Sequence, residues 1–336
     1  MKKTSTLILF VLTLMLMTSC FKKEDALTLV DGNTTVTQLN MGADYNKQIF
    51  FDLGTNTFKT NEISDWDICF DAKPSGYGVF INNGTNVLAK KTGSYSPLDV
   101  TYEDTFNINL YDEQTGDLYK SAIGDWTKYV RDFGGGPVNG IFILDLGNKL
   151  LTKDRYKKIS IIRSDDTSYS IKYCNLNEAK WETYTIAKSK TENFTYFSFK
   201  GLGQIVKNVE PEKNTWDLEF TQYKHIFYNQ GPDPFPYKVT GILINPNHVS
   251  VYIDSVTNFN DLTPAICSNL KLSSRRDIIG YNWKTIDFGT YNYSVNSNIN
   301  YIIKDTEGKI YKLRFLDFYN ANRIKGYPKF EFIRVI

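Results

Sequence analysis

Imidazole is the side chain that most often moves protons or binds metal near neutral pH. This chain of 336 residues contains two histidines, His225 and His248. Two imidazoles leave few ways to build a histidine-based metal cluster or a catalytic triad. No G-x-S-x-G word or other nucleophile signature accompanies them. We therefore expect that the protein is not an enzyme.

The same two histidines remain candidate ligands. They lie 23 residues apart, so they would converge on one ligand only if the intervening segment folds back. A surface or packed position is the commoner fate of such residues. These residues alone do not predict whether the protein binds a metal.

Three other words are typical of binding loops but lack an essential residue. Gly134-Gly135-Gly136-Pro137 has no following Lys-Ser/Thr, so it is a turn-rich loop and not a phosphate cradle. The word that begins at Gly201 has Val206 where a dinucleotide fingerprint needs its third glycine. Asp165-Asp166 lacks the ligand spacing of a calcium loop.

The N-terminus is typical of an exported lipoprotein. Met1-Lys2-Lys3 is followed by an apolar run from Leu7 to Met17, which fits the core of a secretory signal and is too short to span a membrane. Small residues directly before Cys20 resemble a lipobox, in which Cys20 becomes the lipidated N-terminus. We expect a signal peptide over 1–19 and a polar tether over 20–40. Lys22 to Asp25 resembles a surface-export signal, although a solvated tether reads the same way.

Three cysteines remain besides Cys20. Because no C-x-x-C pair occurs, a zinc ribbon or a thioredoxin-like site is disfavoured. Cys69 and Cys174 lie in strand-like runs and can form one disulfide. The alternative is that both, with Cys267, are buried small apolar residues.

Composition sets the broad class. Aromatic residues reach 15%, with 23 Tyr and 22 Phe, and these types favour β-strands. The formal charge of +2 leaves no electrostatic footprint for nucleic acid. The length predicts about two domains.

An internal repeat supports two domains. Several words recur in the same order, 150 to 163 residues apart. They are Trp66-Asp67 with Trp216-Asp217, the words at Gly78 and Gly241, Trp126 with Trp283, and the words at Tyr156 and Tyr311. Strand-like words that begin at Gln48 and Phe194 precede the two W-D words. We expect two tandem homologous all-β domains over 41–185 and 186–336.

Local patterns add detail to the β prediction. Trp216, Leu218 and Phe220 alternate and should share a buried face. The neighbouring aspartate should cap a turn or bond a nearby backbone amide. The Asn83-Gly84 pair favours a hairpin turn, and residues 301–311 read as a hairpin. The proline-rich segment 231–236 should be a projecting loop, and a short helix is expected near 257–265.

These words resemble the HmuY-like family of haemophore-type lipoproteins. Trp216-Asp217-Leu218-Glu219-Phe220 matches its W-D word, and Lys312-Leu313-Arg314-Phe315 with Lys325-Gly326 matches its closing strands. The resemblance covers about 190–336 and is weaker in the first half. Trp66, Asp67, Trp216, Asp217, Trp283 and Gly326 are structural residues of these words.

The resemblance implies a β fold whose loops grip haem or a related tetrapyrrole for uptake. The family's best-known axial histidines are missing from 272–280 and from the position near Phe288, so His225 and His248 are the remaining candidate haem ligands. Tyrosine also ligates haem iron, but the sequence nominates none. The implied partner is an outer-membrane transport receptor, and the implied location is the lipid-anchored outer surface of a Gram-negative cell. The alternative is a surface binding or adhesion module that kept the fold but lost iron ligation.

Overall fold

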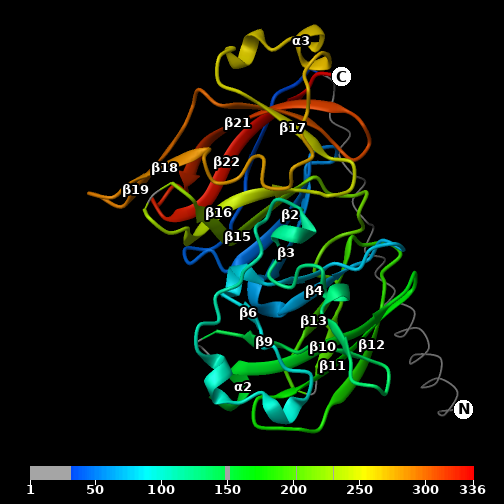
Figure 1. The fold of residues 1–336 in the computed structure, drawn as a ribbon. Helices are drawn as coiled ribbons and strands as arrows, with labels where there is room; N and C mark the ends of the chain where they lie inside the picture. The colour runs from blue at the N-terminus through cyan, green and yellow to red at the C-terminus, as the bar shows by residue number, and fades with distance from the viewer. Residues whose placement is uncertain (1–31, 148–151, 202, 230) are drawn as a thin grey trace, which may run out of the picture.

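Strands dominate the computed structural model, which describes residues 32–147, 152–201, 203–229 and 231–336 (Figure 1). In this part of the chain the α helices are α2 (Thr152–Arg155) and α3 (Pro264–Ser268). The 3₁₀ helices are η1 (Ile63–Asp65), η2 (Asn83–Thr85), η3 (Pro97–Asp99), η4 (Tyr102–Thr105), η5 (Leu118–Lys120), η6 (Trp126–Lys128) and η7 (Phe259–Asp261). The expectation of a mainly β protein is confirmed. The expected signal peptide, Cys20 and the first part of the expected tether lie outside the described residues.

One unit joins both ends of the chain, and we call it the terminal unit. Its five-stranded sheet has the order β1-β22-β21-β20-β17, and its four-stranded sheet has the order β16-β15-β2-β3. A hairpin, β18-β19, projects from it (Figure 1). The strands are β1 (Thr35–Gln38), β2 (Lys47–Asp52), β3 (Thr57–Glu62), β15 (Leu218–Phe227), β16 (Phe235–Ile244), β17 (Ser250–Asp254), β18 (Lys284–Asp287), β19 (Asn292–Val295), β20 (Asn300–Lys304), β21 (Ile310–Tyr319) and β22 (Lys325–Arg334).

The middle of the chain forms a second unit, the central unit, drawn below the first in Figure 1. Its sheets have the orders β12-β11-β10-β9-β6 and β14-β13-β4-β5, with a hairpin β7-β8. The strands are β4 (Ile68–Asp71), β5 (Val79–Ile81), β6 (Leu88–Lys91), β7 (Val130–Asp132), β8 (Pro137–Asn139), β9 (Phe142–Asp145), β10 (Tyr156–Ser164), β11 (Ser168–Asn175), β12 (Glu182–Ala187), β13 (Phe194–Ser198) and β14 (Gln204–Val206).

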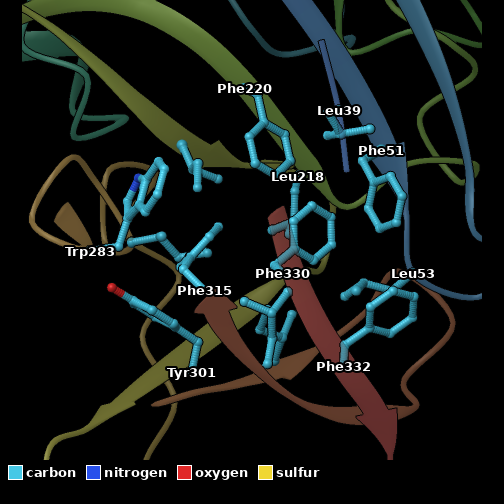
Figure 2. Close-up of a cluster of buried hydrophobic side chains, with 14 of the residues drawn as sticks. Leu39, Phe51, Leu53, Leu218, Phe220, Trp283, Tyr301, Phe315, Phe330 and Phe332 are labelled. Atoms are coloured by element: carbon cyan, nitrogen blue, oxygen red, sulfur yellow. The ribbon is translucent and has the colours of Figure 1, made fainter. Parts of the chain in front are cut away.

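The core of the terminal unit is aromatic and lies between its two sheets (Figure 2). Phe330 stacks on Phe220 with ring centroids 5.5 Å apart and meets Phe51 edge-on at 5.1 Å. Trp283 stacks on Phe315 at 4.2 Å. Such ring pairs contribute about 0.5–1.5 kcal/mol each beyond the burial of apolar area. Residues from both ends of the chain therefore share one core.

The sheets do not follow the domain boundaries expected at 185 and 186. β2 pairs with β15, with Phe51 opposite Leu218, whereas β13 pairs with β4, with Phe197 opposite Ile68. The physical reason is burial, because the apolar face of β2 lies in the same core as Leu218 and Phe220. Residues 41–62 and 186–206 thus lie in the unit opposite to the expected one. The tether expected over 20–40 is wrong at its end, because Thr35–Gln38 form β1 and pair with β22.

Local predictions had mixed outcomes. The hairpin between β20 and β21 is confirmed, with Ile303 opposite Tyr311, and η7 with α3 supplies the short helix close to 257–265. The hairpin turn at Asn83-Gly84 is wrong, because the Asn82 side chain accepts bonds from the next amides and caps η2. The loop over 231–236 is wrong in part, since β16 already begins at Phe235. The strand tolerates Pro236 because β16 is an edge strand.

Both aspartates of the W-D words bond backbone amides, as expected. The buried Asp217 carboxylate accepts bonds from Leu53 N at 2.9 Å and Thr306 N at 3.0 Å. Asp67 accepts one from Phe199 N at 2.7 Å. Trp216 is buried too, but its ring meets Phe50 at 4.9 Å outside the main core, because β15 starts only at residue 218.

The first prediction tests this aspartate. Asp217→Ala leaves the buried Leu53 amide and the partly buried Thr306 amide without an acceptor. Each such loss costs about 1–3 kcal/mol, so the free energy of unfolding should fall by about 2–5 kcal/mol in urea titrations. Asp44→Ala, at an exposed position, is the control and should stay within about 0.5 kcal/mol of the parent. A loss below about 1 kcal/mol for Asp217→Ala contradicts this role.

Candidate functional site

His225 lies in a cleft of about 400 Å³ beside the outer end of β15. We call it the His225 cleft; its walls come from β15, from the loop before β18 and from the loop between β6 and β7. They comprise Glu113, Gln114, Lys120, Lys224, His225, Ile226, Phe227, Tyr228, Asn229, Arg275 and Asp277. Its volume falls within the roughly 300–1,000 Å³ range of small-molecule sites.

Aromatic rings hold the imidazole. The His225 ring meets Phe227 at 4.8 Å and Tyr281 at 4.9 Å between centroids. Burial lowers the pKa of His225, and the nearby Arg275 guanidinium lowers it further against the opposing effect of Asp277. The imidazole is therefore neutral at pH 7, which is the form that donates a lone pair to a metal.

Charged groups surround the cleft. Glu113 bonds Lys120 at 3.2 Å and accepts a short hydrogen bond from the Tyr228 hydroxyl. Arg275 holds Asp277 through two bonds of 2.5 and 2.9 Å. Lys224 has no acidic partner within the described ranges, and burial lowers its pKa. The cleft thus combines a neutral imidazole with a cation available to an acidic ligand.

The structure does not bring His225 and His248 together. His225 is opposite Tyr237 in the β15–β16 hairpin, whereas Leu218 is opposite Ile244. His248 follows Ile244 in an exposed turn with φ of 69°. Seven strand residues span roughly 24 Å at about 3.4 Å each, so the two imidazoles lie at opposite ends of the hairpin. Metal–nitrogen bonds are close to 2 Å, and this geometry is incompatible with the expected bis-His pair.

The stretch 272–280, where the family resemblance implies a ligand, lies beside His225 and contributes Arg275 and Asp277 to the cleft. Phe288 lies in the turn between β18 and β19 with 71% of its surface exposed. His225 therefore reaches this region from another strand.

The other singled-out residues have structural surroundings. Trp66 is buried and meets Tyr196 at 5.1 Å. Gly326 has φ of 94°, and a Cβ there would lie 2.2 Å from the carbonyl oxygen of Gly42. Cys69 and Cys174 are free and buried, as is Cys267, so the disulfide alternative is wrong.

A second, smaller cavity of about 130 Å³ lies between the two units. Gln48, Asn83, Asp112, Glu219 and Arg276 are among its lining residues, and we call it the junction cavity. Arg276 binds Glu219 at 2.7 Å, lies 5.2 Å from the Phe194 ring and donates its backbone N–H to Thr115 O. One buried guanidinium therefore contacts both units.

Sequence reasoning did not single out Glu113, Asp112, Glu210 or Arg276. The one available signal was the Arg275-Arg276 pair within the stretch 272–280. The sequence does not show that one arginine is exposed with Asp277 while its neighbour is buried with Glu219.

Comparison with known protein families gives a match in the second half of the chain. Residues 190–332 match the family model described as HmuY protein. No curated protein matches the chain. Within the described part, no group of three or more His, Cys, Asp or Glu forms a metal cluster, and no helix there is long and apolar enough to cross a membrane.

Solved structures give weak overall likeness. The chain is similar to a Bacteroides vulgatus protein described as HmuY-like and heme-binding, with 10% identity, 92% and 98% of the two chains covered and a TM-score of 0.25. It is similar to apo PinO from Porphyromonas gingivitis, with 9% identity, 90% and 98% coverage and a TM-score of 0.29. A Bacteroides fragilis protein described as a lipoprotein shares 16% identity, with 54% and 91% coverage and a TM-score of 0.24.

A mutation pair tests the junction. Arg276→Ala leaves the Glu219 carboxylate buried without its cation, and removing one partner of such a pair costs about 3–5 kcal/mol of unfolding free energy. Arg275→Ala breaks a neighbouring exposed pair and should cost at most about 1 kcal/mol. Urea titration measures both, and equal losses contradict the assignment.

The pH dependence of stability is a third test. Burial raises the pKa of Asp112 and Asp217 to about 7 and that of Glu210 to about 8. The folded state therefore keeps protons that the unfolded state loses near pH 4, so these groups stabilise the fold at low pH and lose that contribution as pH rises to about 8.

Glu210→Gln should flatten this decline in urea titrations at about pH 5, 6.5 and 8. Exposed Glu103→Gln is the control, and it should leave the decline unchanged. Parallel profiles for Glu210→Gln and the parent contradict the assignment.

The matched model, the W-D word at Trp216 and the closing strands agree over one part of the chain: residues 190–332 are similar to the HmuY family.

Proposed function

We propose that the protein binds haem or a related tetrapyrrole in the His225 cleft, where the His225 imidazole would hold the iron. The observation that supports this proposal is the His225 imidazole between two aromatic rings in a cleft of about 400 Å³, where burial lowers its pKa. The residues suit the group chemically, because aromatic side chains pack against a flat macrocycle and cations pair with its carboxylates.

Three cationic side chains line the cleft: Lys120, Lys224 and Arg275. Lys120 and Arg275 already have acidic partners, so Lys224 is the best placed to meet a ligand carboxylate without breaking an ion pair. Tyr228 is a weaker ligand candidate, because its bond with Glu113 raises the pKa of its hydroxyl. This ligand set differs from the histidine pair that the family resemblance implies.

The cellular role follows as part of the same proposal. Lipidation at Cys20 would anchor the chain in the outer membrane of a Gram-negative bacterium, with the folded part at the cell surface. One acyl-modified end and a nearly neutral protein favour anchoring by lipid over binding by a basic patch. The tetrapyrrole would then pass to an outer-membrane transport receptor for iron acquisition. No catalytic step is part of this role.

The alternative is a surface binding or adhesion module without iron ligation. A specific observation favours it: large rings are exposed on the projecting hairpins of the terminal unit. Tyr228, Phe235, Tyr237, Phe288 and Tyr291 each expose more than half of their surface. Exposed aromatic residues of this kind are enriched at recognition surfaces.

A haemin titration read by absorbance separates the two functions. We expect saturable binding with a shifted Soret band, and a loss of at least about tenfold in affinity for His225→Ala because the axial bond is removed. His248→Ala removes the other imidazole at an exposed turn and should bind like the parent. Phe288→Ala with Tyr291→Ala should leave haemin binding unchanged.

If the protein binds neither oxidised nor reduced haem saturably, the haem proposal is wrong and the adhesion module is favoured. Binding that survives His225→Ala but weakens with His248→Ala contradicts the cleft as the site.

A further inference from the structure

The two units have the same spatial order of strands, although the strands follow one another differently along the chain. The five-stranded orders β1-β22-β21-β20-β17 and β12-β11-β10-β9-β6 correspond strand by strand. The four-stranded orders β16-β15-β2-β3 and β5-β4-β13-β14 correspond in the same way, as do the hairpins β18-β19 and β7-β8. In this correspondence β4–β11 match β15–β22, and β12–β14 match β1–β3.

Hydrogen bonds repeat this correspondence atom by atom. Asp217 N donates to Phe51 O, and Asp67 N donates to Phe197 O. The carboxylates then accept from Leu53 N and Phe199 N, two residues further along in each case. These contacts identify β13 as the equivalent of β2.

The strand that follows each W-D word repeats the pattern. Asn245 donates its side-chain amide to Trp216 O, and Asn82 donates to Trp66 O. Both also bond the carbonyl three residues before the tryptophan, at Lys213 and Ile63.

Two buried lysines fix the register of the larger sheets. Lys312 Nζ donates to the carbonyls of Phe259 and Leu262, and Lys158 Nζ donates to those of Pro97 and Glu178. The equivalence of Lys158 with Lys312 shifts the words at Tyr156 and Tyr311 by one residue relative to their alignment by sequence.

In chain order, each half contributes eleven strands, β1–β11 and β12–β22. The first three strands of each half nevertheless pair with the last eight of the other half. The family model matches 190–332 as one contiguous segment, which contains β13 and β15 but not β2. Within that segment β13 pairs with β4 of the central unit, and β15 pairs with β2 from outside the segment.

We infer that the protein is a tandem repeat whose halves have exchanged their first three strands within one chain. The first three strands of each half complete the sheets of the other half. The first half is therefore not a spacer. It supplies β2 and β3 to the sheet whose outer end carries His225.

Cysteine pairs on the full chain test this arrangement. Val36 of β1 is opposite Glu331 of β22, and the equivalent pair in the central unit is Thr183 of β12 opposite Lys172 of β11. Directly opposed strand residues have Cα atoms about 4.5–5.5 Å apart, which is within the range of a disulfide. An unexchanged chain would instead place Val36 beside Lys172 and Thr183 beside Glu331.

We expect V36C/E331C to form an intrachain disulfide on mild oxidation, detected by peptide mass spectrometry after digestion. V36C/K172C and T183C/E331C should remain reduced. The single variants V36C, E331C and K172C control for reaction with the native cysteines. Of these, Cys69, Cys174 and Cys267 are buried, and Cys20 lies outside the described residues.

Disulfides in V36C/K172C or T183C/E331C overturn the exchange. A V36C/E331C bond that joins two chains, seen as a dimer on non-reducing gels, overturns exchange within one chain. Failure of V36C/E331C to close, in protein whose circular dichroism matches the parent, overturns it as well.

Discussion

The pairing of β2 with β15 is the contact on which the rest of the terminal unit depends. It brings residues 49–51 against residues 218–220 and places Phe51 beside Phe330 in the core. The Asp217 carboxylate then bonds both Leu53 and Thr306, which ties β2 and the β20–β21 turn to the start of β15. A buried carboxylate is costly unless its oxygens accept such bonds. The β2–β15 pairing and the hydrogen bonds of Asp217 therefore stabilise one another.

The two cavities use charge in opposite ways. In the junction cavity Arg276 and Glu219 neutralise each other, and the lining groups form an interior that fixes one unit against the next. In the His225 cleft the ion pairs lie at the edges, and the imidazole stays neutral among rings. Glu113 and Gln114 line both cavities, so a single loop of the central unit borders the structural site and the candidate binding site.

Sequence reasoning predicted what is encoded locally. Aromatic content and alternation predicted strands, and the ordered words predicted the repeat and the family segment. The role of Asp217 was predictable because a strand aspartate beside buried residues needs amide partners. The partners of each strand were not predictable in the same way. The alternation of apolar residues in β2 suits pairing with either β4 or β15, the strands that follow the two W-D words.

The candidate site shows the same limit. His225 was found by its rarity, but its surroundings come from Arg275 and Glu113, which are 50 and 112 residues away in the chain. The distance between His225 and His248 is set by hairpin register. The sequence gives no direct measure of that register, and so the histidine pair remained plausible until the strands were in place.

The pairing of β1 with β22 has a mechanical consequence. These strands come from opposite ends of the chain and lie side by side. A pull on the N-terminal end of the described chain therefore enters the terminal unit first, and the load spreads through β22 into β21 and the core around Phe330. The central unit begins only after β3, so it lies off this load path. A force between the N-terminal tether and a partner held by the terminal unit would therefore pass through that unit and bypass the central unit.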